Sequence, residues 1–186
     1  MYAVIALFDS KTEREIREIW EELSEQSISF YAEKVENNRP HLTIASYDHL
    51  SMNEFAPKLE RFYQNKSKLP ITLQSLGIFL NTSVLYIAPT VNKELLDFHQ
   101  AFHDYFKQYN TDQDSLYLPG KWVPHCTIAN RLNPESLEDA MSYCLQRLRK
   151  LAGKIESIAV IETIFENGEC ISAPIIHEVK LKESFS

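Results

Sequence analysis

Two stretches of this chain share nearly the same sequence: RPHLTIASYD at residues 39–48 and VPHCTIANRL at residues 123–132. Each contains Pro-His-x-Thr-Ile-Ala, and the two histidines, His41 and His125, lie 84 positions apart. The threonine and isoleucine that follow each histidine favour β-strands. The repetition predicts two copies of one structural unit, and this prediction decides the fold.

The segments on either side of the two motifs also recur in the same order. In both halves a buried strand is followed by an amphipathic helix, the Pro-His motif, a second helix and a further strand. In the order helix, histidine, helix and strand, the corresponding positions are Lys11 and Asn92, His41 and His125, Ser51 and Pro134, and Ile71 and Ile155. Their nearly constant offset of 81 to 84 residues indicates an internal duplication.

We therefore predict an α+β fold with a single bilobal domain formed by residues 1–186. Repeat one spans about residues 1–82 and repeat two about residues 83–166, with two mainly antiparallel sheets that form a central groove and helices on the outside. Residues 167–186 are expected to form a hairpin that turns at Asn167-Gly168 and adds a strand outside the repeat.

Local sequence signals bear on three places in the first half. Ser10 and Glu13 have the spacing of a capping box, which predicts the start of the first helix. Residues 27–33 alternate weakly, as a strand does. Pro57 leaves the start of the helix after Ser51 open, because proline is best tolerated in the first turn of a helix.

The composition limits the possible partners. The net charge of -7 and a pI near 5.4 exclude the broad basic field that drives binding to long nucleic acid. Any nucleic-acid partner is therefore expected to bind locally, as a small nucleotide or an RNA terminus, and not along an extended surface. The N-terminal stretch lacks a basic region, and no run of eighteen apolar residues occurs, so we expect neither secretion nor a membrane span. Three cysteines without a paired spacing fit a reducing compartment. We expect a cytoplasmic monomer.

Strand geometry gives the repeated motif its chemical meaning. Side chains alternate between the two faces of a strand, so His41 and Thr43 share one face, and His125 and Thr127 do the same. By the same alternation, Cys126 turns away with the core residues. If a pseudo-twofold axis relates the repeats, the two histidine and threonine pairs face each other around one anion.

Two opposed histidines suit displacement at phosphorus. One imidazole can act as general base and the other as general acid at neutral pH, while the threonine hydroxyls donate to the non-bridging phosphate oxygens. No carboxylate cluster surrounds either motif, so we expect no metal ion and no other cofactor. The histidines at 99 and 103 have a helical spacing that can bind zinc, but no third ligand is evident, and we expect them to edge a helix face.

Two HxT motifs about eighty residues apart in a duplicated chain of this length resemble those of the 2H (two-histidine) phosphoesterase superfamily, which includes the bacterial 2'-5' RNA ligase-like proteins and cyclic phosphodiesterases. The resemblance covers essentially the whole chain. It implies a bilobal fold with the motifs on facing central strands and metal-independent chemistry on 2',3'-cyclic phosphates or 2'-5' linkages. It also implies His41 and His125 as catalytic residues and Thr43 and Thr127 as phosphate-binding residues.

One position departs from the pattern of the family. Many RNA ligase-like relatives have an arginine five residues after the second histidine, whereas this chain has Asn130 there, followed by Arg131. Strand parity would place Arg131 on the same face as His125, which keeps it a candidate for substrate binding. Trp122, Tyr47 and Phe8 lie on or next to the motif strands or on the opening strand and are candidates for stacking on a base, although core packing is an equal alternative.

Three functional hypotheses follow. The first is an enzyme that opens a ribose 2',3'-cyclic phosphate on a small nucleotide or an RNA end. The second is RNA ligation that forms a 2'-5' linkage, in which a 5'-hydroxyl replaces water. The third is a non-catalytic module that binds a nucleotide or an RNA end. The acidic charge disfavours long RNA as a substrate in each of them.

Overall fold

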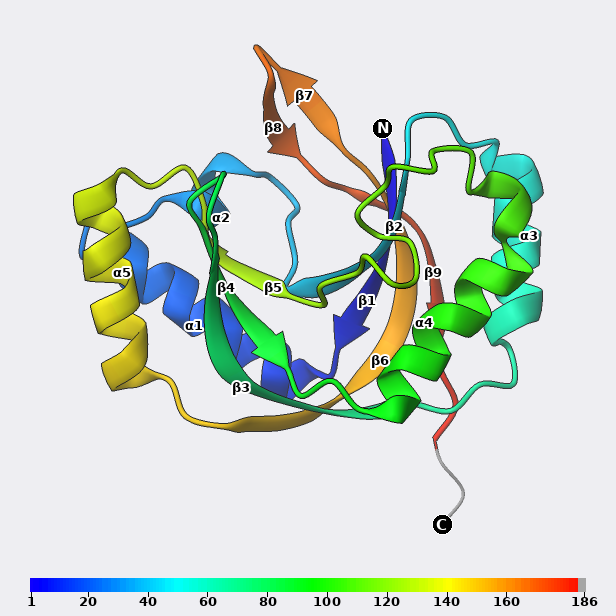
Figure 1. Cartoon of the computed structure of the whole chain (residues 1–186), viewed down its shortest axis with the longest axis horizontal. Helices are drawn as coiled ribbons and strands as arrows, with labels where there is room; N and C mark the ends of the chain where they lie inside the picture. The colour runs from blue at the N-terminus through cyan, green and yellow to red at the C-terminus, as the bar shows by residue number, and fades with distance from the viewer. Residues whose placement is uncertain (184–186) are drawn as a thin grey trace.

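A computed structural model describes residues 1–183 of the chain (Figure 1). The helices are α1 (Ser10–Glu25), α2 (Tyr31–Lys34), α3 (Met52–Tyr63), α4 (Lys93–Tyr105) and α5 (Pro134–Arg147), with a 3-10 turn at Lys107–Tyr109. The strands are β1 (Tyr2–Phe8), β2 (His41–Tyr47), β3 (Leu69–Phe79), β4 (Val84–Pro89), β5 (Cys126–Ala129), β6 (Leu151–Glu162), β7 (Ile164–Glu166), β8 (Glu169–Ser172) and β9 (Ile175–Lys180).

The strands of both halves are hydrogen-bonded into one seven-stranded sheet. Its order is β2-β1-β6-β3-β4-β5, with β9 added on β6, and every pair is antiparallel. The predicted α+β class is confirmed, but the strands expected in two separate sheets are continuous. The long strand β6 joins them, because its first residues pair with β3 and its remaining length pairs with β1.

The strand order supports the predicted duplication. If β1 is exchanged with β4, β2 with β5 and β3 with β6, the same strand order results, read from the opposite end of the sheet. The third strand of each repeat therefore lies beside the first strand of the other repeat. At the centre of the sheet β3 and β6 pair around Ile71 and Gly153, which are 82 positions apart. An axis of pseudo-twofold symmetry would pass between these two residues.

The β1–β2 pair and the β4–β5 pair have matching registers, and each contains a β-bulge at the corresponding position. In the first half the pairs on either side of the bulge are Val4↔Ala45 and Ile5↔Thr43; in the second they are Leu85↔Ala129 and Tyr86↔Thr127. Both bulges leave out the isoleucine that follows the motif threonine, Ile44 or Ile128. A bulge re-aims side chains next to it, so both motifs are presented by the same local geometry.

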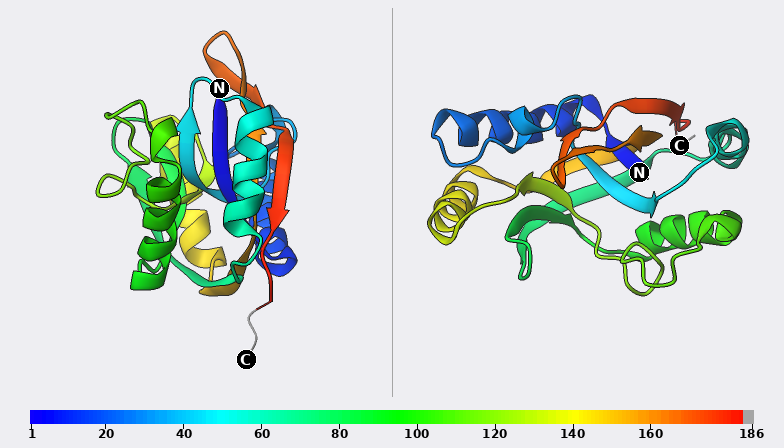
Figure 2. Two further views of the ribbon diagram at one scale, coloured as in Figure 1. Left: turned by 90° about the vertical axis from the view of Figure 1, so that its right-hand side faces the viewer. Right: turned by 90° about the horizontal axis from the view of Figure 1, so that it is seen from above.

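The helices form two pairs on opposite sides of the sheet, α1 with α5 and α3 with α4 (Figures 1 and 2). Each pair joins a helix from repeat one to a helix from repeat two. Aromatic side chains fill the space between α3 and α4, where Phe55 and Phe106 pack with ring centroids 4.9 Å apart. Glu22 of α1 accepts hydrogen bonds from Tyr143 and Arg147 on α5.

Two local predictions are corrected by the structure, and the helix start after Ser51, left open because of Pro57, is confirmed. The N-cap of α1 is Asp9, not Ser10, and its carboxylate accepts from the backbone N–H groups of Lys11 and Thr12. Residues 31–34 form the short helix α2 within the segment that alternated like a strand. Pro57 lies inside α3, which begins five residues earlier at Met52.

The C-terminal part beyond β6 contains two elements. Strands β7 and β8 form the predicted hairpin, and its turn residues Asn167 and Gly168 both have positive φ angles, 51° and 81°, as a tight hairpin turn requires. The added strand outside the repeat is β9, which pairs with β6. Among residues 1–183, no helix is both long and apolar enough to cross a membrane.

Gly153 allows the start of α1 to approach the centre of the sheet. A Cβ atom placed on Gly153 would lie 1.9 Å from the Thr12 hydroxyl and 2.5 Å from the Asp9 carboxylate. That carboxylate also accepts from the backbone N–H of Lys154 at 2.6 Å, so it ties the helix cap to β6. We expect Gly153→Ala to break this contact and to lower the free energy of unfolding by about 1–3 kcal/mol.

Urea unfolding of the variant and of wild type measures this effect. Ala152→Ser, an exposed change at the neighbouring position, serves as the control and should leave the midpoint unchanged. A Gly153→Ala midpoint equal to that of wild type would show that the cap does not depend on the missing side chain.

Candidate active site

The two HxT motifs lie at the two ends of the sheet. β2 and β5 are the first and last strands in the order, so the motifs are not on the central strands that the family resemblance implied. The sheet is curved strongly enough that these end strands contact each other in the middle of the molecule (Figure 2). The curvature of one sheet therefore brings together motifs that are as far apart as possible in its strand order.

Both motifs show the alternation expected for a strand with one buried face. His41 and Thr43 are partly exposed, whereas Leu42 and Ile44 are buried; the same pattern holds from His125 to Ile128. Cys126 is 1% exposed, and burial raises the pKa of its thiol to about 12. Its thiol is therefore unreactive and packs in the core.

The same hydrogen bond orients both histidine rings. His41 Nδ1 lies 2.5 Å from the carbonyl oxygen of Arg39, and His125 Nδ1 lies 2.7 Å from the carbonyl oxygen of Val123. A carbonyl oxygen can only accept, so Nδ1 carries the proton in each ring. Nε2 of each neutral imidazole is therefore left as the basic atom, which suits a general base or, once protonated, a general acid.

Burial lowers the pKa of both histidines below the ordinary value of 6.5. The hydrogen bonds to the Arg39 and Val123 carbonyls act in the opposite direction but are outweighed. The charge of His125 lowers the pKa of His41 further, so the two rings lie within electrostatic reach of each other.

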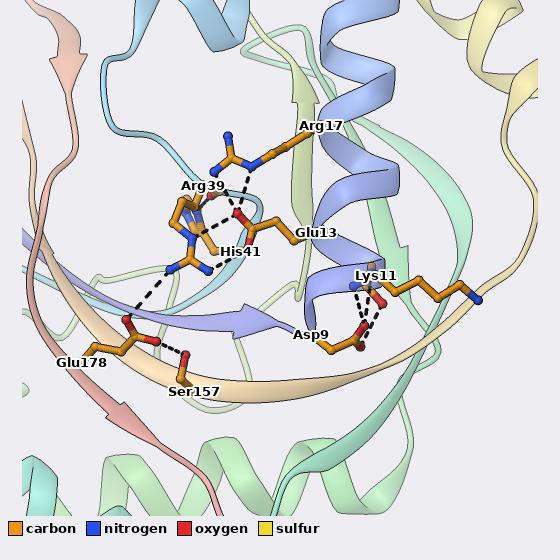
Figure 3. A network of polar contacts seen from close by, with 9 residues as sticks. Asp9, Lys11, Glu13, Arg17, Arg39, His41, Ser157 and Glu178 are labelled. Atoms are coloured by element: carbon orange, nitrogen blue, oxygen red, sulfur yellow. Dashed lines mark hydrogen bonds and ion pairs between the residues drawn. The ribbon is translucent and has the colours of Figure 1, made fainter.

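A charged network holds the residue before the first motif in place (Figure 3). The Arg39 guanidinium donates to Glu13 of α1 at 2.6 Å and lies 3.9 Å from Glu178 of β9. Burial alone would raise the pKa of Glu13, but hydrogen bonds from Arg39 and Arg17 lower it, so the carboxylate stays charged. Because the Arg39 carbonyl orients His41, this network fixes a catalytic candidate through the backbone.

The sequence analysis missed Arg39 because its counterpart in the second repeat is Val123. The surroundings of His125 are instead aromatic. Its ring packs edge-on against Phe79 with centroids 4.7 Å apart, and Tyr86 lies 5.4 Å away. Tyr86 occupies the space over Gly77, where a Cβ atom would lie 2.3 Å from its ring. The two histidines thus have the same orientation but different supports.

The two tryptophans of the chain bind the carbonyl groups of the motif threonines. Trp20 Nε1 on α1 donates to the Thr127 carbonyl at 3.1 Å, and Trp122 Nε1 donates to the Thr43 carbonyl at 2.9 Å. In each case a residue of one repeat binds the motif strand of the other repeat. These bonds satisfy acceptors on end strands, which have no further strand to pair with.

A groove of about 900 Å³ opens beside the motifs. Its wall includes His125, Thr127 and Trp122, the end of β2, the turn between β3 and β4, and the loop at residues 109–118. His41 and Thr43 are not part of this wall. Two tyrosines, Tyr31 and Tyr117, lie close to the motif hydroxyls. Burial raises the pKa of both tyrosines. The interaction with Thr127 lowers the pKa of Tyr31, and the interaction with Thr43 lowers the pKa of Tyr117, but burial outweighs both.

The four further residues that the sequence suggested have different positions. Trp122 and Tyr47 line the groove. The Trp122 ring is stacked on His99 with centroids 3.9 Å apart, and Tyr47 is 8% exposed with an unpaired hydroxyl. Phe8 is 2% exposed in the core, so the structure does not place it for base stacking.

Arg131 lies outside the groove. It has a positive φ of 56° in the turn after β5, and its guanidinium donates to Glu169 of the β8 strand at 2.7 Å. The parity argument that placed it beside His125 does not hold, because β5 ends at Ala129.

His99 and His103 are buried, not at the edge of a helix face. They are 2% and 4% exposed, and His103 Nε2 donates to the Ile44 carbonyl at 3.1 Å. Burial lowers the pKa of His99 to about 4, so its ring stays neutral in the stack with Trp122. Within residues 1–183 no group of three or more His, Cys, Asp or Glu side chains has an arrangement that could hold a metal ion.

Comparisons with known proteins agree with this geometry. The family model described as "2'-5' RNA ligase superfamily" matches residues 8–164. A search of curated proteins found no significant match. The structure is similar to that of LigT from E. coli in its apo form, with a TM-score of 0.62 and 10% identity over 98% of this chain and 97% of that chain.

Two further structures show the same fold. TT0787 of Thermus thermophilus has a TM-score of 0.62 and 13% identity over 99% of both chains. E. coli LigT complexed with 3'-AMP has a TM-score of 0.60 and 12% identity over 97% of this chain and 96% of that chain. At these identities the similarity shows the fold and not a shared substrate.

The tryptophan hydrogen bonds generate a prediction about the stability of the motif strands. Trp122→Phe keeps an aromatic ring over His99 but removes the donor to the Thr43 carbonyl. Trp20→Phe removes the donor to the Thr127 carbonyl. We expect each variant to lose about 1–2 kcal/mol in the free energy of unfolding, because a partly buried acceptor is left without its partner. Urea unfolding monitored by circular dichroism checks this.

Tyr105→Phe is the control, since it removes a polar group from a ring that is 45% exposed on α4. Its stability should equal that of wild type. If the tryptophan variants are as stable as this control, the indole donors do not hold the end strands.

Proposed function

Because the chain belongs to the 2'-5' RNA ligase superfamily, we propose that it is a metal-independent phosphoesterase that opens a 2',3'-cyclic phosphate on a small nucleotide or an RNA terminus. The observation that carries this proposal is the pair of histidines on contacting end strands. Each is held through Nδ1 by the carbonyl two residues before it, which leaves both Nε2 atoms for proton transfer.

The chemistry assigns complementary roles to the two rings. One neutral imidazole takes a proton from the attacking water through Nε2, and the water oxygen forms a bond to phosphorus. The bond from phosphorus to the ribose 3'-oxygen breaks, and the other, protonated imidazole gives its proton to that oxygen. The product is a 2'-phosphate with a free 3'-hydroxyl, and the two histidines end with their protonation states exchanged.

Thr43 and Thr127 provide the phosphate contacts in this proposal. Each lies two residues after its histidine on the same face of the strand. Hydroxyl donors aimed at the non-bridging oxygens stabilise the charge that develops on phosphorus during displacement. With imidazoles for proton transfer and hydroxyls for charge, the reaction does not require a metal ion to polarise the phosphate.

The similar structures support a nucleotide as substrate. E. coli LigT, which shares this fold, was crystallised with 3'-AMP and with phosphate. Both complexes are of LigT, and they support the view that this fold accommodates a nucleotide with a ribose phosphate. A second candidate function is 2'-5' ligation, which the family description favours, with a 5'-hydroxyl of RNA in place of water. The net charge of -7 favours hydrolysis of a small substrate over ligation of two RNA chains.

Turnover of a 2',3'-cyclic mononucleotide, a 2'-5' dinucleotide and a cyclic-phosphate-ended RNA, each with EDTA present, tests the proposal. We expect hydrolysis of the cyclic mononucleotide with EDTA present, and a loss of about 10² to 10⁴ in kcat for His41→Ala or His125→Ala. The double variant should be little worse than the worse single variant, because both rings serve one reaction.

His177→Ala is the matched control, because His177 lies on β9 beside Glu60 and outside the groove wall. It should retain wild-type turnover. Binding of 3'-AMP without turnover in wild type would instead support the non-catalytic binding module, and activity restored after EDTA only by a divalent ion would contradict the proposed mechanism.

The lowered pKa of both histidines predicts the pH dependence of kcat/KM. The rate requires one neutral and one protonated ring, so it is highest between the two pKa values. Because both values lie below 6.5, we expect a bell-shaped profile with its maximum on the acid side of pH 6.5. Initial rates with a 2',3'-cyclic mononucleotide measure this, since the cyclic diester keeps one charge throughout the range. A maximum above pH 7.5 would contradict the assignment.

A further inference from the structure

The outer part of the groove has an unusual apolar wall. Leu80 in the turn between β3 and β4 is 94% exposed, and Leu116 in the loop at residues 109–118 is 73% exposed. In the described part of the chain they are the two most exposed large hydrophobic side chains, and both line the groove. Large apolar side chains left in water beside a concave site are typical of ligand contacts.

The charged side chains of the same wall are mostly acidic. Asp48, Asp112 and Asp114 are exposed there, against one lysine, Lys121. The Lys121 ammonium is committed to its own loop, since it donates to the Gln113 carbonyl at 2.8 Å and lies 3.9 Å from the Asp114 carboxylate. We call the part of the groove wall formed by Leu80, Leu116 and these three aspartates the outer groove.

The arginines next to the two motifs do not offset this charge. Arg39 is paired with Glu13, and Arg131 is paired with Glu169; neither lines the groove. Lys58 lies behind Tyr109, to whose hydroxyl it donates at 3.0 Å, and it is also not part of the wall. The wall also contains the exposed ammonium group of Met1, so three carboxylates face two ammonium groups, Met1 and Lys121, and the groove keeps a net negative charge. A ligand that extends from His125 into the outer groove therefore meets apolar side chains and negative charge.

We propose that the outer groove selects nucleotides whose sole phosphate is the one that reacts. Leu80 and Leu116 contact the uncharged base, and the three carboxylates repel a second phosphate. This inference rests on the proposed function and deepens it, because it restricts the substrate class to singly phosphorylated mononucleotides and disfavours RNA ends, whose terminal nucleotide carries a second, 5'-linked phosphate. A volume of about 900 Å³ is large enough to hold a nucleoside beside the reacting phosphate.

The first measurement compares kcat/KM for adenosine 2',3'-cyclic phosphate and for the same compound with an added 5'-phosphate. We expect a preference of roughly 10-fold for the singly phosphorylated compound at low ionic strength, falling towards equality at about 1 M salt because exposed charges are screened. Equal kcat/KM values at low salt, or a preference for the doubly phosphorylated compound, would overturn the inference.

Charge-neutral variants then test the residues. Asp112→Asn combined with Asp114→Asn should raise kcat/KM for the doubly phosphorylated compound several-fold more than for the singly phosphorylated compound. The matched control is Glu138→Gln combined with Asp139→Asn, two exposed carboxylates on α5 outside the groove, which should leave the preference at its wild-type value. The inference is refuted if the Asp112/Asp114 double variant keeps the wild-type preference for the singly phosphorylated compound. It is also refuted if this preference falls equally in the Glu138/Asp139 double variant.

The apolar contact is tested separately. Leu80→Ser combined with Leu116→Ser should raise KM for adenosine 2',3'-cyclic phosphate roughly 10-fold with kcat nearly unchanged, since these side chains are far more exposed than the core and contact only the bound base. An unchanged KM would show that the base does not lie in the outer groove.

Binding measurements separate this inference from the proposed reaction. Calorimetry with 3'-AMP and with adenosine 3',5'-bisphosphate requires no turnover. Tighter binding of 3'-AMP in a protein that hydrolyses nothing would support the inference and refute the proposed function. Hydrolysis of the cyclic nucleotide combined with equal binding of both ligands would refute the inference alone, and the absence of binding of either ligand would also refute it.

Discussion

The structure depends on the curvature that brings the two end strands of one sheet into contact. An end strand normally presents unpaired carbonyl and N–H groups to water. Here the carbonyls of the motif strands are bound by side chains from the opposite half: Trp20 on Thr127, Trp122 on Thr43, and His103 on Ile44. The helices and the long loop therefore hold the edges in place, and the histidines keep a fixed position beside the groove.

The frame is nearly symmetric, but the site is not. The two halves share their strand order, their registers, both bulges and the hydrogen bond from each histidine Nδ1. The supports differ: ion pairs fix the residue before His41, whereas aromatic rings surround His125. The groove wall includes His125 and Thr127 but neither His41 nor Thr43. In the reaction that we propose, both rings take part in proton transfer, while the rest of the substrate contacts an asymmetric wall.

The local pattern of the sequence was sufficient for most strands, for the order of the four long helices and for the alternation of His, Thr and core residues around each motif, but not for the short helix α2. These features arise from neighbours in the chain. The union of both sheets through β6 was not predictable, because it depends on the pairing of Ile71 with Gly153, far apart in sequence. Arg131 failed for a related reason: a parity argument holds only while the strand continues, and β5 ends at Ala129. Arg39 was missed because the second repeat has no arginine at the equivalent position, and because its partners Glu13 and Glu178 come from distant elements.

The exchange of third strands between the repeats has a consequence for the order in which the chain can acquire structure. β1, which precedes the other described strands in the sequence, pairs along its whole length with β6, about 150 residues later. Until residues 151–162 have been synthesised, β1 has only β2 as a partner, and β3 has only β4. Closing such a long loop delays productive pairing and leaves apolar strand edges open during synthesis. Each repeat therefore lacks a strand that its own first or third strand pairs with, because the other repeat supplies it.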